Sequence, residues 1–535
     1  MKMSGAKMVI ESLHQEGVEV VFGYPGGAIM NVYDEIYKQN YFEHILNRHE
    51  QACVIAAEGY ARSTGKTGVA IVTSGPGFTN AITGIADAYM DSIPVVIISG
   101  QVPTTIIGTD GFQEIDAVGI SRPCTKHNYL VNKIEDLPRI IKEAFHLAST
   151  GRPGPVHVDI PKDITAQLGE FIYPSEVSMP TYKPTLNYNK KQLKRAMEAI
   201  SNAKKHLLYI GGGAILSNCG YEIRDLAKKL NIPAVETLMA RGVMGDENPL
   251  FFGMLGMHGE YAANMAAHET DLLISLGARF DDRVTGRLDE FASKAKVIHI
   301  DIDPTSIAKL VVADYPIVGD LKLTVEAMIE DADNYDINDF SNWVELLKDY
   351  REKEPLRYID TDDLIKPQWP IQRVGKILGD NAIISTDVGQ HQMWTAQFFP
   401  FSHPRQWITS GGLGTIGFGL PAALGATRAF KGTNRVVVNF TGDGSILMNI
   451  QELMTCSEYE LPVINIVLNN NYLGMVRQWQ TMFYENRLAE TDLTAQPKFK
   501  MLAEAFNCLG YTVSTKAEFD EAFKDAVEKR KPAMI

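Results

Sequence analysis

The sequence predicts an α/β protein built from three doubly wound parallel-sheet domains. Short β-branched runs alternate with helix-length segments along the chain, which is typical of parallel sheets covered by helices. Two of these stretches are near copies of each other. At 535 residues the chain is also too long for one hydrophobic core. We therefore expect several domains of one class, two of them related.

The near copies lie in the two ends of the chain. The first reads GVAIVTSGPGFTNAITGIADAYMDSIPVVIISG (68–100), and the second reads RVVVNFTGDGSILMNIQELMTCSEYELPVINIVLNN (435–470). Each has a strand, a small-residue turn with glycines, a helix, and a second strand that begins at a proline. The turn glycine and this proline are 17 positions apart in the first copy and 18 in the second. We interpret the two stretches as one doubly wound domain present twice.

A different region separates the copies. The runs HLLYIGGGA, DLLISLGARF and KVIHIDIDP each end in glycines or acidic turns, which predicts a middle α/β domain. A proline- and tyrosine-rich segment precedes it and a charged segment follows it. The predicted domains are 1–170, 189–335 and 367–535, with linkers at 171–188 and 336–366. The alternative is a single domain interrupted by insertions.

Composition argues against several function classes. The formal charge of −14, from 51 basic and 65 acidic residues, argues against a nucleic-acid surface. No apolar run approaches the roughly 18 residues of a membrane span, and the N-terminus has helical periodicity without a signal peptide's pattern. The cysteines lack CxxC spacing, as is typical of reduced cysteines in a cytoplasmic enzyme. They are Cys53, Cys124, Cys219, Cys456 and Cys508.

The second copy places a carboxylate where the first has a proline. In TGDGS, Asp443 stands between Gly442 and Gly444, which let the backbone approach a diphosphate closely. Asn470 ends the next strand. Because neighbouring parallel strands end at one edge of a sheet, the two side chains fit a Mg²⁺ ion that bridges a diphosphate. Pro76 in the first copy cannot bind the ion in this way. The alternative is an ordinary Gly-Asp-Gly turn.

The spacing from this Gly-Asp-Gly to Asn469-Asn470 resembles the fingerprint of thiamine-diphosphate-dependent enzymes. In that superfamily one copy binds the pyrimidine ring and the other the diphosphate, at an interface between subunits. The superfamily needs a glutamate in the pyrimidine copy, and NRHEQACVIAAEGYA places Glu50 at the start of a predicted helix. The resemblance implies that Glu50 bonds a pyrimidine nitrogen. The alternative is an acid stabilised by the helix dipole.

Ten blocks extend a resemblance over essentially the whole chain. They are GYPGGA (23–28), RHEQ (48–51), EGYARSTGK (58–66), TSGPG (73–77), GTDGFQE (108–114), GRPGPVHVDIPKD (151–163), LGMHG (255–259), GARFDDRVTG (277–286), QWITSGGLGTIGFGLPAA (406–423) and LGMVRQWQ (473–480). Their order is similar to that in acetohydroxyacid synthase, the catalytic subunit of acetolactate synthase in branched-chain amino-acid biosynthesis. The first and third domains would then be thiamine-diphosphate-binding copies, and the middle one FAD-binding.

The resemblance implies a carboligation. Pyruvate is decarboxylated on thiamine diphosphate, and the hydroxyethyl unit is joined to a second 2-oxoacid. Pyruvate as acceptor gives 2-acetolactate, and 2-oxobutyrate gives 2-aceto-2-hydroxybutyrate. One alternative is a pyruvate oxidase or 2-oxoacid decarboxylase of the same fold, although the adjacent histidines common in decarboxylases are absent from the sequence. The other alternative is a catalytically silent subunit.

The resemblance assigns roles to individual residues. Catalytic roles fall to Gly27, Glu50 and Gln113. Contacts to thiamine diphosphate fall to Glu50, Ile416, Gly442, Asp443, Gly444, Ser445 and Asn470. The Mg²⁺ ligands would be Asp443, Asn470 and the backbone of Tyr472. Residues toward the substrates would be Phe112, Met257, Arg283 and Trp479, with the guanidinium meeting the acceptor's carboxylate and the indole favouring its ethyl group.

The middle domain resembles the family's FAD-binding domain through GARFDDRVTG, HIDIDP and VGDL, whereas GGGA (211–214) is a weak signal by itself. The positions expected near FAD are Arg152, Gly212, Thr237, Leu238, Met239, Met257, His258, Gly277, Arg279, Asp282, Arg283, Asp301, Ile302 and Asp320. Because the ligation is redox-neutral, the flavin would be structural. This separates the chain from FAD-free catabolic acetolactate synthases.

The chain departs from the family pattern at a few positions. Ile416 stands where many relatives have methionine, and Thr104 and Thr105 stand where relatives often have basic residues. The chain stops at RKPAMI, so we expect the C-terminal segment that covers the active site to be truncated. The resemblance also implies a homodimer or homotetramer with active sites at subunit interfaces, and a small regulatory subunit.

Overall fold

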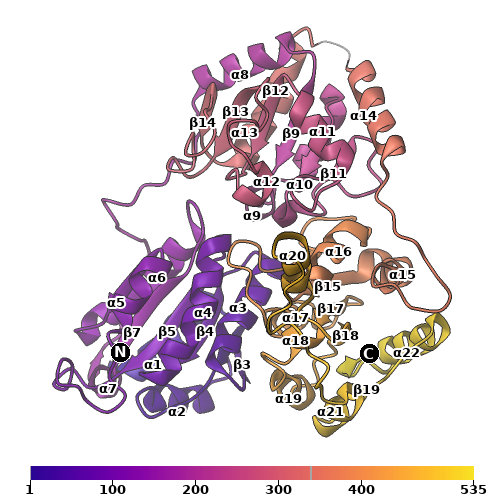
Figure 1. The fold of residues 1–535 in the computed structure, drawn as a ribbon. Coiled ribbons are helices and arrows are strands. Elements are labelled where there is room, and N and C mark those ends of the chain that lie inside the picture. The colour runs from indigo at the N-terminus through magenta and orange to yellow at the C-terminus, as the bar shows by residue number, and fades with distance from the viewer. Residues whose placement is uncertain (1, 338–339) are drawn as a thin grey trace. The chain divides into compact units, whose positions relative to one another are not determined.

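The computed structural model describes residues 2–337 and 340–535 (Figure 1). They form two compact units. The first unit contains Met1–Tyr182, Ile383–Gln392 and Ile408–Ile535, and the second contains Lys183–Ala382 and Met393–Trp407. The first and last sheets belong mainly to the first unit, and the middle sheet belongs to the second.

The first sheet has six parallel strands in the order β3-β2-β4-β5-β7-β6. Along the chain they are β2 (Val20–Gly23), β3 (Glu43–Leu46), β4 (Gly68–Val72), β5 (Val95–Gln101), β6 (His127–Leu130) and β7 (Val156–Pro161). The helices are α1 (Gly5–Gln15), α2 (Met30–Lys38), α3 (Glu50–Thr64), α4 (Pro76–Asp91), α5 (Ala117–Ser121), α6 (Leu137–Ser149) and α7 (Lys162–Ala166). Strands β4, β5 and β7 are buried throughout, as expected for parallel strands covered on both faces. A short antiparallel pair, β1 (Lys2–Ser4) with β8 (Leu168–Glu170), joins the two ends of this domain.

The last sheet repeats this topology, with the order β16-β15-β17-β18-β20-β19. Its strands are β15 (Ala382–Thr386), β16 (Trp407–Ile408), β17 (Val436–Gly442), β18 (Ile464–Leu468), β19 (Leu509–Gly510) and β20 (Ala533–Met534). The helices of this part of the chain are α15 (Gln368–Leu378), α16 (Gln390–Phe398), α17 (Gly419–Ala429), α18 (Asp443–Ile446), α19 (Glu452–Glu458), α20 (Gly474–Phe483), α21 (Phe499–Ala505) and α22 (Lys516–Lys529). Counted along each copy, both sheets have the strand order 2-1-3-4-6-5. The shared order confirms that one domain is present twice.

The middle sheet has a different order, β11-β10-β9-β12-β13-β14, and all its pairings are parallel. Its strands are β9 (His206–Ile210), β10 (Ala234–Glu236), β11 (Phe251–Met254), β12 (Leu272–Leu276), β13 (Lys296–Asp301) and β14 (Tyr315–Val318). The helices are α8 (Lys190–Asn202), α9 (Gly213–Leu216), α10 (Gly220–Leu230), α11 (Tyr261–Glu269), α12 (Asp282–Thr285), α13 (Leu321–Asp331) and α14 (Ser341–Lys353). Counted along the chain, the order is 3-2-1-4-5-6, that of dinucleotide-binding domains. The prediction of three parallel-sheet α/β domains is therefore confirmed.

Helices α3 and α17 join the two copies within the first unit. A Cβ atom on Gly59 would lie 2.1 Å from the carbonyl oxygen of Ala422, and one on Gly425 would lie 1.9 Å from that of Ala56. All but two of the 15 residues of α3 are buried, as expected for a helix packed on every side. Helix α3 begins at Glu50, and α17 follows the loop that carries Ile416. The contact between the two helices therefore involves the elements that carry or follow these two predicted site residues.

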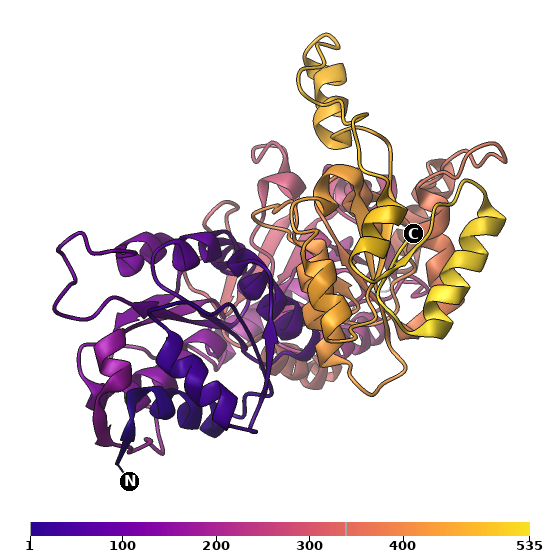
Figure 2. The same ribbon diagram turned by 90° about the horizontal axis from the view of Figure 1, so that it is seen from below.

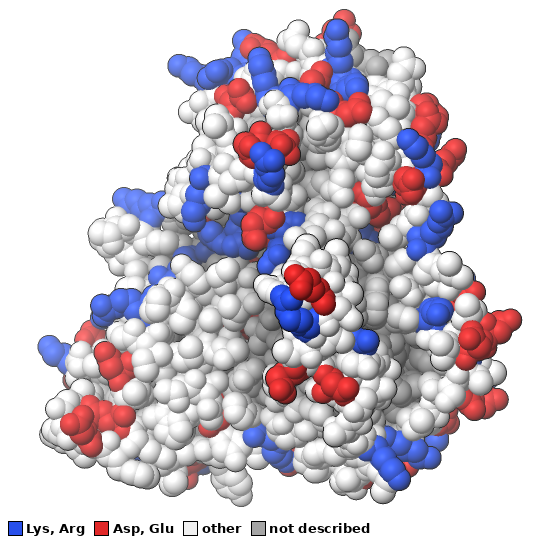
Figure 3. All heavy atoms as spheres, in the orientation of Figure 1, with Lys and Arg blue, Asp and Glu red and all other residues white. Residues whose placement is uncertain are grey.

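The surface carries charges of both signs. On the face shown in Figure 3, acidic and basic side chains are scattered in small groups, and broad areas carry neither. Within the described ranges, the structure contains no helix with both the length and the apolar character needed to cross a bilayer.

Candidate active site

The turns after β2 and β4 meet at the carboxyl edge of the first sheet. A Cβ atom on Gly26 would lie 2.5 Å from the side chain of Thr73, and one on Gly77 would lie 2.6 Å from it. Thr73, the first residue of the TSGPG turn, is therefore packed between Gly26 of the GYPGG turn and Gly77 of its own turn. Gly27 differs, because a Cβ atom there would meet no atom within 4 Å. The predicted catalytic glycine thus borders open space beside the TSGPG turn.

Glu50 begins α3 and is directed toward the same turn. Its N-cap is His49, whose Nδ1 accepts a hydrogen bond from the Gln51 amide at 3.1 Å. The Glu50 side chain is largely buried, at 9% exposure, and its Oε2 accepts a hydrogen bond from Asn80 Nδ2 at 3.0 Å. Its Oε1 lies 3.3 Å from the position of a Cβ atom on Gly77. The carboxylate is thus held by the first turns of α4.

Gln113 reaches the TSGPG turn from a third loop. A Cβ atom on Gly75 would lie 2.8 Å from the Gln113 carbonyl oxygen, and both residues have a positive φ, of 57° and 60° respectively. Gln101 Nε2 supports this loop by donating to the carbonyl of Ile115 at 2.9 Å. Phe112 beside it is 90% exposed. The structure therefore brings the three predicted catalytic residues together around the TSGPG turn, with Phe112 on the open side.

In the second copy, Asp443 lies buried at the end of β17, with 2% exposure. Its Oδ1 accepts from the Gly444 amide at 3.1 Å, and its Oδ2 accepts from Gln496 Nε2. Gln496 also accepts a hydrogen bond from Asn469 Nδ2 at 2.9 Å and so connects the two strand ends. Burial raises the pKa of Asp443 above its ordinary value. A nearby cation would relieve this cost.

Asn470 and Tyr472 form the turn after β18, which pairs with β17. Asn470 Oδ1 accepts from the Tyr472 amide at 3.0 Å, and its Nδ2 lies 2.8 Å from the position of a Cβ atom on Gly474. With Asp443, this turn offers carboxylate, amide and peptide oxygens, the donor types that Mg²⁺ prefers. Among the described residues, no group of three or more His, Cys, Asp and Glu side chains suits a metal. A site with one carboxylate therefore fits Mg²⁺ shared with a phosphate.

The turn DVGQH after β15 also belongs to this edge of the sheet, and sequence reasoning missed it. A Cβ atom on Gly442 would lie 3.1 Å from the ring of His391, and Ser445 Oγ donates to the Val388 carbonyl at 3.3 Å. Burial lowers the pKa of His391 to about 3, so the ring is neutral. DVGQH is the counterpart of GYPGG in the first copy. A glycine-containing turn after the first strand of each copy was the signal available in the sequence.

Ile416 lies on a glycine-rich loop that leads into α17. The side chain is 39% exposed, and the neighbouring Gly414 and Gly417 have positive φ values of 72° and 89°. Asn449 Nδ2 donates to the Gly417 carbonyl at 2.7 Å. The loop thus presents Ile416 outward at the start of α17.

Trp479 lies on α20, the helix that follows the Asn470–Tyr472 turn. No residue of α20 is buried, and in Figure 2 this segment projects from its domain. Trp479 is 37% exposed, whereas the nearby Met482 and Phe483 exceed 60%. Trp479 is therefore not a core residue of the single chain.

In the middle domain, two glycine-rich turns meet where the strand order reverses. A Cβ atom on Gly211 would lie 2.2 Å from the Gly277 carbonyl oxygen, and one on Gly213 would lie 2.8 Å from the Gly277 Cα. One on Gly212 would lie 3.1 Å from Met239 Cβ. The ends of β9, β10 and β12 therefore converge at the switch point, where sheets of this order bind nucleotides.

The other positions expected near FAD follow strand ends of the same sheet. Thr237 donates its amide to the Ile210 carbonyl at 2.9 Å and precedes the 3₁₀ turn Leu238–Ala240. Asp320 caps α13 by accepting from the Leu323 amide at 3.0 Å. The remaining members are Arg279, Asp282 and Arg283 after β12, and Asp301 and Ile302 at the end of β13.

Two predicted substrate residues are neighbours in this domain. The Met257 amide donates to the Arg283 carbonyl at 2.8 Å. Arg283 Nε lies 3.8 Å from Asp282 Oδ2, and both side chains are more than half exposed. Exposed ion pairs of this kind contribute little stability. The His258 carbonyl accepts a hydrogen bond from Gln397 Nε2 at 2.8 Å.

Arg152 lies in the first unit, in the N-terminal domain, whereas the other predicted FAD residues lie in the second unit. Its Nε donates to Ser92 Oγ at 2.8 Å. The structure therefore does not by itself join Arg152 to that group.

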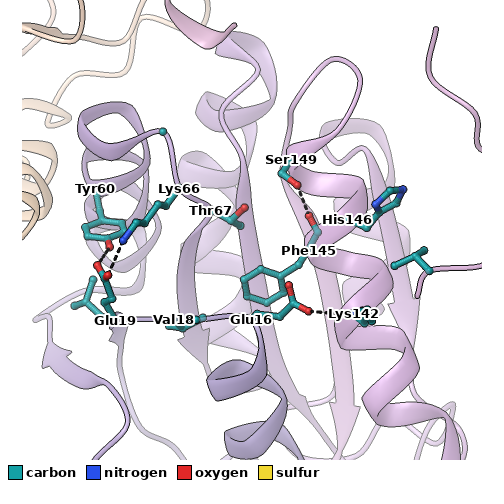
Figure 4. Close-up of a pocket in the computed structure, with 14 residues that line it drawn as sticks. Glu16, Val18, Glu19, Tyr60, Lys66, Thr67, Lys142, Phe145, His146 and Ser149 are labelled. Carbon is teal, nitrogen blue, oxygen red and sulfur yellow. Dashed lines mark hydrogen bonds and ion pairs between the residues drawn. The ribbon is translucent and has the colours of Figure 1, made fainter. Parts of the chain in front are cut away.

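A pocket of about 590 Å³ lies at the opposite, amino-terminal edge of the first sheet (Figure 4). Its charged groups pair with one another. Glu19 accepts from Lys66 Nζ at 2.5 Å and from Tyr60 Oη at 2.6 Å, and Lys142 Nζ lies 3.7 Å from Glu16. The pocket therefore has no excess charge of one sign, and it is separate from the residues predicted to be catalytic.

The chain matches three family models, in the order of its three sheets. Residues 3–120 match the thiamine pyrophosphate enzyme N-terminal TPP binding domain, 193–328 the central domain, and 387–535 the C-terminal TPP binding domain. Each of the two end models thus matches one copy of the repeat.

Several characterised proteins are similar over nearly the whole chain. Acetolactate synthase isozyme 3 large subunit of Escherichia coli is 48% identical over 533 residues, which cover 98% of this chain and 92% of that protein. Acetolactate synthase large subunit of Haemophilus influenzae is 49% identical over 531 residues, with the same coverage. Probable acetolactate synthase large subunit of Methanocaldococcus jannaschii is 45% identical over 543 residues, covering 100% and 91%.

Proposed function

The chain belongs to the thiamine-diphosphate-dependent acetolactate synthase large subunits, and from this we propose that it decarboxylates pyruvate and joins the two-carbon unit to a second 2-oxoacid. The acceptors would be pyruvate, giving 2-acetolactate, and 2-oxobutyrate, giving 2-aceto-2-hydroxybutyrate. One structural observation supports the proposal in addition to family membership. Two domains of identical strand order present different chemistry at the equivalent edge, a buried glutamate in one and a metal-type oxygen set in the other.

Glu50 is proposed to hold the pyrimidine ring. Asn80 bonds to Oε2, which leaves Oε1 as the oxygen that would bond a ring nitrogen. Bound thiamine diphosphate supplies the carbon that carries the two-carbon unit and stabilises its negative charge. Gln113 and Gly27, on either side of the TSGPG turn, would position the reacting groups.

Asp443, Asn470 and the Tyr472 carbonyl are proposed to bind Mg²⁺. Their fit rests on the buried carboxylate of raised pKa and on three neutral or anionic oxygen donors at adjacent strand ends. Gly442, Gly444 and Ser445 would face the diphosphate. We add His391 to this side, because its ring packs on Gly442.

The middle domain is proposed to bind FAD in a structural role. Its 3-2-1-4-5-6 strand order and the convergence of Gly212, Gly277 and Met239 at the switch point support a dinucleotide site. Asp301 and Asp320, at strand and helix ends of the same sheet, would contact polar parts of the nucleotide. The ligation needs no net electron transfer, so the flavin would not turn over.

Four residues are proposed to act on the substrates. Arg283 would bind the acceptor's carboxylate with its exposed guanidinium. Trp479 would contact the acceptor's alkyl group, and one methylene there is worth about 1–3 kcal/mol. Phe112 and Met257, both exposed in the single chain, would line the entrance.

We propose a homodimer as the minimum assembly, and a homotetramer as its extension. Glu50 and Asp443 lie in different copies, and the superfamily pairs such copies from two subunits. The relatives' names include "large subunit", from which we propose a small regulatory partner. We also propose a cytoplasmic location, because the five cysteines are dispersed along the chain.

The proposal is tested by product analysis of the purified chain with thiamine diphosphate, Mg²⁺ and FAD. Pyruvate should give 2-acetolactate, and pyruvate with 2-oxobutyrate should give both acetohydroxy acids. Repeating the assay without FAD tests the structural role of the flavin. Acetaldehyde or peroxide as the main product, with no acetolactate, would overturn the proposal.

A further inference from the structure

We propose that the two copies hold each other's active-site loops. Carboxylates on α4 of the first copy position the loop that carries Ile416, and Glu452 on α19 of the second copy positions the turn that leads into Glu50. This inference rests on the proposed function, and it assigns positioning roles to Asp87, Asp91 and Glu452, which lie outside the ten blocks and outside the predicted site.

Asp91, at the end of α4, binds the backbone of the loop. Its Oδ2 accepts from the Gly411 amide at 2.9 Å, and its Oδ1 accepts from the Gly412 amide at 2.7 Å. A Cβ atom on Gly412 would lie only 3.0 Å from Asp91 Oδ1 and from Met90 Cβ. The carboxylate thus bonds two successive peptide groups, across 320 and 321 positions of sequence.

Asp87, one helical turn earlier, bonds to residues at both ends of the same loop. Its Oδ2 accepts from Ser410 Oγ at 2.5 Å and also from Thr415 Oγ1. Ser410 Oγ in turn accepts from the Thr415 amide at 2.9 Å. Both ends of the SGGLGT loop are therefore bonded to one buried carboxylate, and Ile416 is the next residue.

Arg62 on α3 holds the two aspartates in place. Its Nη2 lies 2.8 Å from Asp91 Oδ2, 3.5 Å from Asp87 Oδ1 and 3.2 Å from Glu58 Oε2. Three buried carboxyl groups face one guanidinium, so burial and mutual repulsion raise the pKa of Glu58 strongly and that of Asp87 to about 6. Glu58 contacts Arg62 and not the loop, which makes it the natural control.

Glu452 makes the reciprocal contact. Its Oε1 accepts from the Arg48 amide at 2.9 Å, and its Oε2 accepts from Asn47 Nδ2 at 3.0 Å. Thr455 Oγ1 supports the carboxylate from the next turn of α19 at 2.8 Å. Arg48 is two residues before Glu50, so this bond lies at the entry of α3.

The two contacts are equivalent within the repeat. Helix α4 follows the TSGPG turn and holds the loop before α17, whereas α19 follows the TGDGS turn and holds the turn before α3. Helices α3 and α17 are themselves the pair that joins the copies. A loop with three glycines loses much backbone freedom when it is ordered. The hydrogen bonds from Asp87 and Asp91 therefore fix the conformation of the SGGLGT loop, which its glycine-rich sequence does not fix by itself.

The first test compares Asp91→Asn and Asp87→Asn with Glu58→Gln. Thiamine diphosphate with Mg²⁺ is titrated calorimetrically, and amide hydrogen exchange is followed across residues 408–418. Both aspartate variants should raise the dissociation constant about tenfold, because a charge-assisted bond is lost. Asp91→Asn should also accelerate exchange at Gly411 and Gly412, whose amides bond to this carboxylate. Glu58→Gln should change the dissociation constant less than twofold.

Ser410→Ala tests the same contact from the loop side if an aspartate variant does not fold. It removes one bond, keeps the carboxylate, and should weaken cofactor binding by about threefold. Unchanged binding and exchange in the folded aspartate and serine variants would overturn the proposal. So would a Glu58→Gln variant that weakens binding as much as they do.

The Glu452 contact predicts a different result, in which kcat changes more than the cofactor dissociation constant. Glu452→Gln should lower kcat about tenfold at saturating cofactor and change the cofactor dissociation constant less than threefold, because Glu50 is displaced while the diphosphate side is intact. Glutamine keeps an acceptor, so Glu452→Ala should lower kcat further. An unchanged kcat in both variants would overturn this part of the proposal. A wild-type protein that binds the cofactor but forms no acetolactate would contradict the proposed function, while exchange at residues 408–418 would still test the loop contact.

Discussion

The first and last domains share one strand order but differ in the turns at the equivalent edge, most clearly in the turn after the third strand of each copy. In the first, Gly75 has a φ of 57° and Pro76 opens a 16-residue helix. In the last, Gly442 is extended, with a φ of −97°, and Asp443 opens a helix of only four residues. A proline at the first helical position offers neither an N–H group nor a side-chain oxygen, whereas an aspartate offers a metal ligand. The comparison shows that a repeated scaffold can present different chemical groups at equivalent turns, as the proposed division of the site between the copies requires.

The neighbouring turns follow the same division. GYPGG packs on the small side chain of Thr73 and leaves open space at Gly27, where a ring can enter. DVGQH packs the neutral imidazole of His391 on Gly442. The strand order keeps the two turns equivalent, while their residues suit a planar ring on one side and a diphosphate on the other.

Replacing the aspartate that distinguishes the copies should have the largest effect. Asp443→Ala removes the carboxylate that we propose to bind Mg²⁺, and we expect kcat/KM for pyruvate to fall at least about 100-fold, since even residues that support metal ligands are worth about 10–100-fold. Calorimetric titration of Mg²⁺ in the presence of thiamine diphosphate measures the loss of Mg²⁺ affinity that we expect to cause this decrease. Pro76→Ala, at the equivalent position, should leave the Mg²⁺ affinity within about twofold. Equal losses of Mg²⁺ affinity in the two variants would contradict the division.

Glu50→Gln tests the other half of the comparison. Losing the carboxylate proposed to take part in acid–base chemistry should lower kcat by about 100-fold at saturating cofactor, while the Mg²⁺ affinity should change less than about threefold. Steady-state kinetics with pyruvate and the same Mg²⁺ titration separate the two quantities. Unchanged kcat would refute the role proposed for Glu50.

Adding a methyl group at the contact between α3 and α17 tests how much the packing of the two copies against each other contributes to stability. Gly425→Ala places a carbon against the Ala56 carbonyl, and we expect the free energy of unfolding to fall by about 3 kcal/mol. Urea unfolding measures this change. Gly432→Ala is the matched control, because a Cβ atom there meets no atom within 4 Å. Its positive φ of 79° strains an alanine, so we expect a cost of about 1 kcal/mol from the backbone alone. An equally stable Gly425→Ala would show that the helices can separate without cost.

The smallest expected effect is the pH dependence of the Glu452 contact. Burial raises the pKa of Glu452 to about 7 from an ordinary 4.5, so the folded protein keeps the proton that the unfolded chain loses. The wild type's free energy of unfolding, relative to that of Glu452→Gln, should therefore decrease as the pH rises from about 4.5 to about 7, by less than about 3 kcal/mol in total. Urea unfolding of both proteins at pH 5 and pH 8 measures it. A difference that does not change with pH would contradict the raised pKa.

Sequence alone determined the repeat, and it predicted which residues form the two half-sites. Glycine turns after β-branched runs, one proline and one aspartate at the equivalent position, and a glutamate before a helix are local patterns, and the structure has a strand end or a helix start at each of them. The roles of Glu50, Asp443 and Asn470 remain predictions, but their placement at turns and element ends follows from short-range preferences of the backbone.

Only the tertiary structure decided which distant segments meet. Strand order distinguishes the 2-1-3-4-6-5 end domains from the 3-2-1-4-5-6 middle domain, and it places His391 beside Gly442. The bonds from Asp91 to the loop before α17 span 320 positions or more. Such contacts depend on how helices pack over sheets after the chain has folded. No local pattern encodes them, because the energy that selects them is the burial of surfaces contributed by many separate segments.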